Sequence, residues 1–258
     1  MPVSALEVGW EEGVKALLGA THLRTLSVDL DVLPMRAPAR PDFPQVVASI
    51  MPHVSTLHVV AVRSLPFILD AGSTLTKLRA LSVETTRPVA VAELQGLLDS
   101  VPCMTRLEQL RCVLTVPNPG EEDDGEHLDL GPLCGGLGRL TGLTRLEWIA
   151  RGTARAGRYQ QQVLSACSKL LRLATLQLGQ LWVEAYADFA RVVPQMPLRR
   201  LEVDVPTHTA LEVVLKVVPQ LPHLRQAYVD TGQLGVVARS AMQIVVATLP
   251  ACDMGCDG

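Results

Sequence analysis

The stretch Leu143-Thr-Arg-Leu146-Glu-Trp148 contains a motif that occurs eight times along the chain. It consists of an apolar residue, two residues of any type, a second apolar residue, a polar residue and a third apolar residue. Close variants begin at Leu23, Val54, Leu78, Leu107, Leu173, Leu198 and Leu224. The second apolar residues of the eight motifs are positions 26, 57, 81, 110, 146, 176, 201 and 227. Self-similarity at such a period predicts an array of stacked units.

Each motif predicts a strand, because its later residues alternate between apolar and polar side chains. Leu26 and Val28 point inward and Ser27 outward, which is the period of a strand with one buried face. Between the motifs, apolar residues recur at steps of three and four, which predicts amphipathic helices. These helices are expected around 46–51, 94–101, 163–167, 186–193 and 211–218. One strand and one helix cannot bury their own apolar faces, so the units should stack into a curved array.

Helix ends are also recognisable. Thr209-Ala-Leu-Glu212 fits a capping box, in which the hydroxyl and the carboxylate each accept a hydrogen bond from a free backbone N–H. Prolines then follow four of the expected helices, since proline cannot continue the helical hydrogen-bond ladder. These prolines are Pro52, Pro102, Pro197 and Pro222.

The motifs over residues 22–230 resemble the irregular leucine-rich repeats of ribonuclease-inhibitor-like and F-box-associated proteins. The resemblance implies an α/β solenoid of about eight repeats, with a curved parallel sheet on the concave side and helices on the convex side. It also implies a role in reading substrates for a ubiquitin ligase. No F-box-like module is expected before the first motif.

The segments outside the array have their own expectations. Residues 1–21 carry an apolar stripe and predict an N-terminal capping helix, and 231–250 predict a C-terminal capping helix. Residues 251–258 are expected to form a tail. Two segments rich in proline, glycine and charge, 117–132 and 151–159, are expected to be insert loops, one acidic and one basic.

Composition excludes several classes of function. The chain has 258 residues, 48% of them hydrophobic and 3% aromatic, and a net charge of −3 with no basic run. We therefore expect no nucleic-acid partner. We expect no signal peptide, and no long uncharged apolar stretch occurs in the sequence, so we expect no membrane association and an intracellular, cytoplasmic monomer.

Chemical motifs are few. The six cysteines form no CxxC pair and no zinc spacing, so no metal or cofactor is expected. The glycine-rich stretch 131–138 is interpreted as turn chemistry. No nucleophile elbow, P-loop or HExxH motif is present. The alternative hypothesis is a hydrolase with a site in the 117–159 loops, in which His127 and Asp129 would act.

The favoured hypothesis is a non-enzymatic scaffold that binds a protein partner on the concave sheet. Strand alternation points two columns of side chains away from the helices, with apolar residues near the centre and acidic residues toward the ends. An interface with a dry middle and a polar rim has this composition. The alternative is that single exposed apolar residues are ordinary on a protein surface and indicate no interface. The candidate partner-binding residues are Arg111, Val113, Glu147, Ile149, Glu202, Asp204 and Tyr228.

Overall fold

The computed structural model describes residues 24–29, 54–61, 77–85, 95, 99–115, 130–152, 155–231 and 242–244. Within these ranges the strands form one nine-stranded sheet in the order of the chain. The strands are β1 (Thr25–Asp29), β2 (Thr56–Ala61), β3 (Ala80–Thr85), β4 (Gln109–Thr115), β5 (Arg145–Arg151), β6 (Thr175–Gln180), β7 (Arg200–Asp204), β8 (Gln226–Asp230) and β9 (Met242–Ile244).

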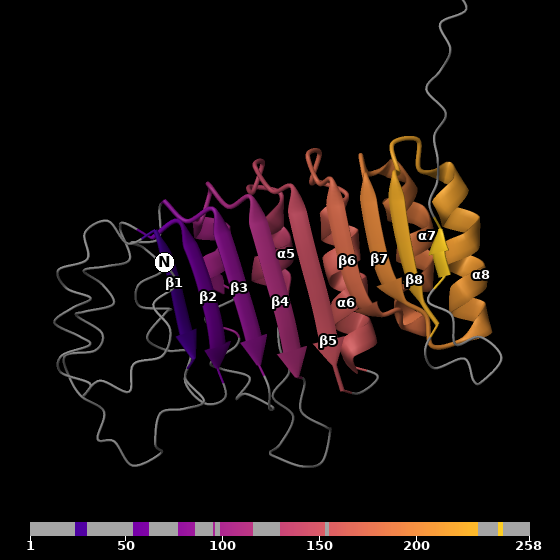
Figure 1. Cartoon of the computed structure of the whole chain (residues 1–258), viewed down its shortest axis with the longest axis horizontal. Helices are drawn as coiled ribbons and strands as arrows, with labels where there is room; N and C mark the ends of the chain where they lie inside the picture. The colour runs from indigo at the N-terminus through magenta and orange to yellow at the C-terminus, as the bar shows by residue number, and fades with distance from the viewer. Residues whose placement is uncertain are drawn as a thin grey trace, which may run out of the picture.

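The sequence motifs and the first eight strands coincide. Strands β1 to β8 pair in parallel with their chain neighbours, as Figure 1 shows. The second apolar residue of each motif lies opposite its equivalent: Leu110 pairs with Leu146, and Leu146 with Leu176. The eight expected strands and their register are therefore confirmed.

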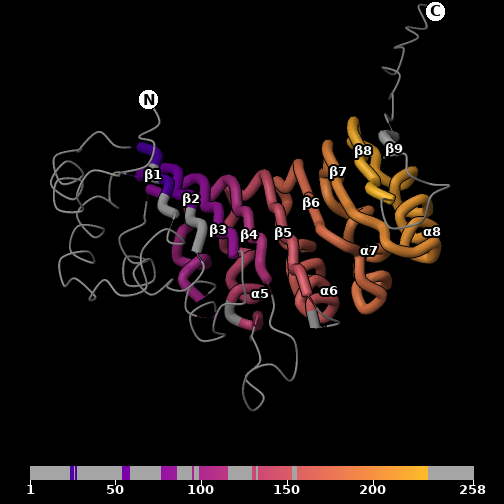
Figure 2. Tube along the Cα trace, turned by 60° about the horizontal axis from the view of Figure 1, so that its bottom comes forward, coloured from indigo at the N-terminus to yellow at the C-terminus, as the bar shows by residue number. Residues whose placement is uncertain are grey.

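The helices cover one face of this sheet, so the protein is an α/β fold. They are α5 (Gly131–Leu137), α6 (Arg155–Cys167), α7 (Tyr186–Val192) and α8 (His208–Val217), with short 3-10 turns η3 (Val101–Cys103), η4 (Val183–Ala185), η5 (Val193–Gln195) and η6 (Val218–Gln220). Figure 2 shows the strands and helices as two layers. We call the opposite face, on which no helix of the described residues lies, the open face.

One hydrophobic core cluster lies between the two layers and extends from Val54 to Val229. The inward leucines of the strands are almost fully buried in it, among them Leu81, Leu146 and Leu176. Trp148 and Phe189 are its bulkiest side chains. Burial of these apolar surfaces against the helices is the main stabilisation of the fold.

Helix α5 corrects two expectations. Residues 131–138 were expected to be turn chemistry and 117–132 a loop, but a helix begins at Gly131. The glycine at position 136 serves close packing, because a Cβ atom there would clash with the ring of Pro102 in η3. Glycine lowers helix propensity here, yet it allows this approach. Residues 117–129 lie outside the described residues.

The expected basic loop 151–159 is also wrong over its second half, because α6 begins at Arg155. Ala156 and Tyr159 are buried against the core, which extends the apolar face of the helix toward its N-terminus. Gly157 again permits close packing, since a Cβ atom there would clash with the Glu184 carboxylate. Gly152 ends the strand with φ 129°, a conformation that favours glycine.

The C-terminal end of the sheet also differs from the sequence prediction. Residues 242–244, expected to be helical, form β9, which pairs antiparallel with β8. This pairing satisfies backbone groups that β8 would otherwise leave at the edge of the sheet. The N-cap of α8 is Thr207 rather than Thr209: its hydroxyl accepts a hydrogen bond from Ala210 N at 3.1 Å. The expected N-terminal helix 1–21 and tail 251–258 lie outside the described residues.

In the described residues, no helix is long and apolar enough to cross a membrane.

Candidate interaction surface

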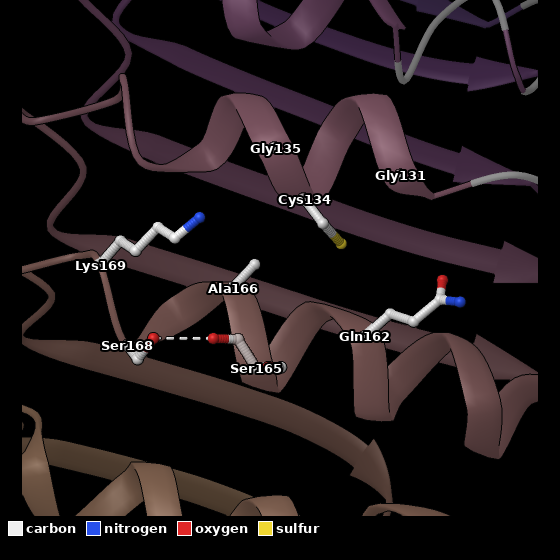
Figure 3. A pocket seen from close by; sticks show the side chains of 8 residues that line it. All are labelled: Gly131, Cys134, Gly135, Gln162, Ser165, Ala166, Ser168 and Lys169. Atoms are coloured by element: carbon white, nitrogen blue, oxygen red, sulfur yellow. Dashed lines mark hydrogen bonds between the residues drawn. The ribbon is translucent and has the colours of Figure 1, made fainter.

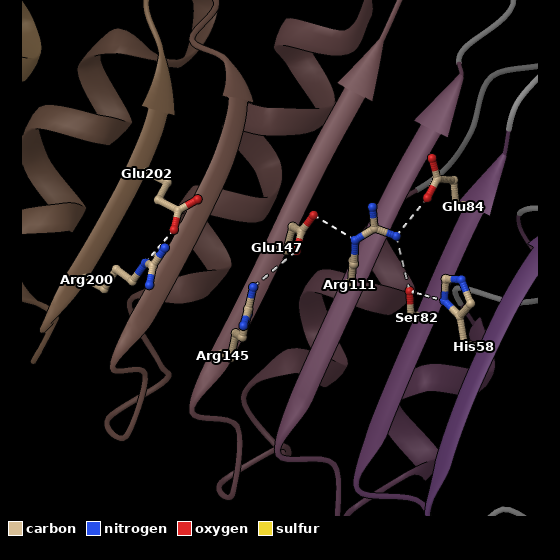
Figure 4. Close-up of polar contacts among 8 residues, drawn as sticks. All are labelled: His58, Ser82, Glu84, Arg111, Arg145, Glu147, Arg200 and Glu202. Atoms are coloured by element: carbon tan, nitrogen blue, oxygen red, sulfur yellow. Dashed lines mark hydrogen bonds and ion pairs between the residues drawn. The ribbon is translucent and has the colours of Figure 1, made fainter. Parts of the chain in front are cut away.

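The open face carries a chain of polar side chains that crosses four strands, from β2 to β5 (Figure 4). Its centre is Arg111 on β4. The Arg111 Nε donates to Glu147 Oε1 on β5 at 2.8 Å, and one terminal nitrogen donates to Glu84 Oε2 on β3 at 2.9 Å. Because parallel pairing places Ser82, Arg111 and Glu147 side by side, these bonds run across the strands.

The chain of contacts continues on both sides of Arg111. The same terminal nitrogen lies 3.3 Å from Ser82 Oγ, which is 2.7 Å from His58 Nδ1 on β2. On the other side, Arg145 lies 3.6 Å from the second carboxylate oxygen of Glu147. Glu147 therefore forms ion pairs with two arginines.

Burial makes this arrangement more than a surface ion pair. Glu147 is only 5% exposed, although strand alternation points it away from the core. Burial of Arg111 lowers its pKa, but hydrogen bonds to Glu84 and Glu147 outweigh that effect, and the net pKa is raised. Arg111 therefore stays charged, and its guanidinium holds three strands together.

The prediction of an exposed apolar centre on this face is partly wrong. Val113 was expected to be exposed, but it is 0% exposed, while lying outside the main core cluster. Its cross-strand neighbours are Glu84 and Ile149. Ile149 is half-buried and lies over Gly179, where an added Cβ would be 2.9 Å from its Cγ2.

The other end of the open face, on β7 and β8, is more exposed. Arg200 forms an ion pair with Glu202 and lies 5.1 Å from the centre of the Tyr228 ring. Asp204 lies opposite Asp230. Partial burial, with the charges of Asp230 and Glu202, raises the pKa of Asp204. A positive charge placed here would relieve that repulsion.

A groove on the helix side offers less chemistry. It lies between α5 and α6, has a volume of about 510 Å³, and is open to solvent (Figure 3). Its polar groups include Cys134, Gln162 and Lys169. No group of three potential metal ligands occurs among the described residues. Burial raises the pKa of the Cys112 thiol to about 12, so this cysteine is an unreactive core residue.

The structure brings the predicted residues together in two groups. Arg111, Val113, Glu147 and Ile149 lie on β4 and β5, and Glu202, Asp204 and Tyr228 on β7 and β8. The candidate list left out Ser82, Glu84, Arg145 and Arg200, which contact its members, and His58, which contacts Ser82. The aligned motifs carry this signal, because equivalent positions become cross-strand neighbours. His127 and Asp129, proposed for a hydrolase, lie outside the described residues.

No protein-family model matches the chain, and no curated protein matches it in a sequence search.

Proposed function

We propose that this chain is a leucine-rich repeat solenoid of about eight repeats, of the irregular ribonuclease-inhibitor-like or F-box-associated type. The one-to-one agreement between motifs and strands supports this proposal, since a repeated motif with repeated register is typical of a solenoid. Side chains also extend the strand ladder: Thr115 N donates to Thr85 Oγ1 at 2.7 Å. The sheet would then be the concave surface.

We further propose that the protein is a non-enzymatic scaffold whose open face binds a protein partner. The observation that carries the proposal is the broad open face, on which none of the described helices lies and which presents charged, aromatic and apolar side chains. Neighbouring strands lie roughly 4.8 Å apart, so eight strands span roughly 34 Å, the scale of a protein contact. Arginine and tyrosine are enriched where binding energy concentrates.

The two ends of the open face would contribute differently to such binding. Arg111 and Glu147 are already paired with each other, so they would shape the surface rather than supply new ion pairs. Asp204 is exposed, and its raised pKa favours a partner that brings a lysine or arginine, while Tyr228 and Glu202 are partly exposed beside it. A partner of this kind would be a folded protein or a substrate presented to a larger complex, such as a ubiquitin ligase.

Site-specific photocrosslinking tests this proposal. A photoreactive residue placed at Gln177, on the open face of β6, should capture a protein partner in cells. The same residue at Arg158, exposed on α6, serves as the matched control. We expect capture through position 177 and a several-fold loss when Tyr228 is changed to alanine. Capture through position 158 alone would contradict an open-face site.

A further inference from the structure

The turns that lead into the strands form a continuous edge of the sheet, which we call the amino edge. It comprises these turns and the first residue of each strand, and runs along the top of the sheet in Figure 1. The Arg24 carbonyl accepts hydrogen bonds from the N–H groups of Ser55 (2.8 Å) and Thr56 (3.0 Å). Arg199 O accepts in the same way from Arg225 and Gln226. Successive turns are therefore fixed side by side, roughly 4.8 Å apart.

Basic side chains gather on this edge. In its first half, Arg24 precedes β1, Lys77 and Arg79 precede β3, and Arg106 precedes β4. The single acidic residue in the described part of the edge is Glu108, which lies 3.2 Å from Arg79. The first half thus has a surplus of positive charge.

The second half continues the pattern through β5, β6, β7 and β8. Each of these strands has a basic residue at its start or in the turn before it. Arg200 is the first residue of β7. The others are Arg139, Arg145, Lys169, Arg172, Arg199 and Arg225. All of them are exposed.

Within the described part of the chain, most of these basic side chains have no acidic partner. Arg79, Arg145 and Arg200 each form an ion pair with a glutamate. The other eight basic side chains of the edge make no ion pair with any residue in the described part of the chain. Like charges on adjacent strands repel, so they do not stabilise the fold. The segregation is marked because the chain as a whole carries a charge of −3.

An apolar side chain lies within the basic edge. Leu171, between Lys169 and Arg172, is 83% exposed, the most exposed large apolar residue in the described ranges. It is held in the tight turn before β6, where Leu170 and Leu173 point into the core. An exposed leucine flanked by cations suits a ligand that combines negative charge with an apolar group.

The chemistry of the edge selects among polyanions. Guanidinium groups match carboxylates in a bidentate geometry, and the edge has nine arginines to two lysines. Single-stranded nucleic acid is held by stacking its bases on aromatic rings. No tryptophan, tyrosine or phenylalanine lies in the described part of the edge. An acidic polypeptide therefore fits better than a nucleic acid.

We propose that the amino edge binds an extended acidic segment of a protein partner, with an apolar side chain of that segment on Leu171. The aspartate and glutamate carboxylates pair with the guanidinium groups along the edge. This site is separate from the open face and does not depend on it, so the same scaffold could hold two partners.

Fluorescence anisotropy with the full chain tests the proposal. The probe is a labelled glutamate-rich peptide of about ten residues, which spans roughly 34 Å when extended, with one central leucine. At about 50 mM salt we expect binding that weakens strongly at about 300 mM, because exposed charges are screened. The double change Arg199→Glu and Arg225→Glu should weaken binding at least about tenfold.

A matched double variant, Arg151→Glu and Arg158→Glu, makes the same charge change away from the edge and should have little effect. Leu171→Ser should weaken binding of the leucine peptide but not of a peptide with central serine. Absence of peptide binding, an equal loss in both double variants, or tighter binding of a charge-matched single-stranded oligonucleotide would overturn the proposal. Failure of crosslinking through position 177 would instead count only against the open face.

Discussion

The two ends of the open face use the same strand positions in different ways. On β3 to β5, Arg111 pairs with Glu84 and Glu147, and the neighbouring Val113 is fully buried. On β7 and β8, Arg200 pairs with Glu202, while Asp204 is exposed and its pKa is raised. The first end is neutralised within the molecule and stabilises the sheet. The second end keeps charge that a partner could use.

This difference teaches that an outward position is not always an accessible one. Strand alternation tells which face a side chain occupies, but its cross-strand neighbours determine whether water reaches it. Val113 and Glu147 point outward and are buried, whereas Glu202 and Tyr228 point outward and are partly exposed.

The strongest test of this contrast is a charge at Val113. Val113→Asp should lower the free energy of unfolding by on the order of 3–5 kcal/mol, because it leaves an unpaired carboxylate out of water. Val183→Asp is the control, since Val183 is 67% exposed, and should change stability by no more than about 0.5 kcal/mol. Urea unfolding of both variants measures the difference. Equal effects would mean that Val113 is accessible after all.

The alternation itself can be tested on β6. Leu176→Ala should cost about 2–5 kcal/mol, because it leaves a cavity in the core between sheet and helices. The adjacent Gln177→Ala should cost much less, since Gln177 points to the open face. Thermal unfolding of the two variants checks the register, and a larger cost for Gln177→Ala would show that the register is wrong.

The next largest difference in stability is expected between the Arg111 network and the Arg200 ion pair. Arg111→Met should cost about 1–3 kcal/mol, because Glu147 loses its closest cation while it remains buried. Arg200→Met should cost about 0–1 kcal/mol, as is usual for an exposed ion pair. A double-mutant cycle of Arg111→Met with Glu147→Gln isolates the coupling. No coupling would indicate that the network does not stabilise the sheet.

The smallest effect concerns Asp204 and pH. A carboxyl whose pKa is higher in the folded state than in the unfolded state stabilises the fold when protonated and destabilises it when ionised. The stability contribution therefore falls as pH rises above 3.8. Asp204→Asn should raise the stability at neutral pH by less than about 1 kcal/mol, and by progressively less toward acid. Lower stability of the variant at neutral pH would refute this sign.

Much of the sheet could be predicted from the sequence. The eight motifs define β1 to β8 and their register, because a period of two residues fixes which side chains face the core. Helix α5 was missed because its glycines suggest turns. Its helical signal was present in Leu130, Leu133 and Leu137, but the close approach to Pro102 that requires Gly136 is a tertiary contact.

The site was less predictable than the fold. The outward columns could be identified, and Arg111, Glu147 and Tyr228 indeed lie on the open face. The ion pairs could not be identified, because they depend on side-chain reach across three strands. The same reasoning explains why the burial of Val113 was missed and why the basic amino edge emerges only when the turns are placed side by side.

Hydroxyl-radical footprinting, with and without the protein captured through position 177, tests the central claim most directly. We expect protection of Tyr228 and Ile149 on the open face and unchanged reactivity of Leu215, which is exposed on α8. Protection of Leu215 with unchanged reactivity of Tyr228 and Ile149 would contradict the proposal that the open face binds the partner.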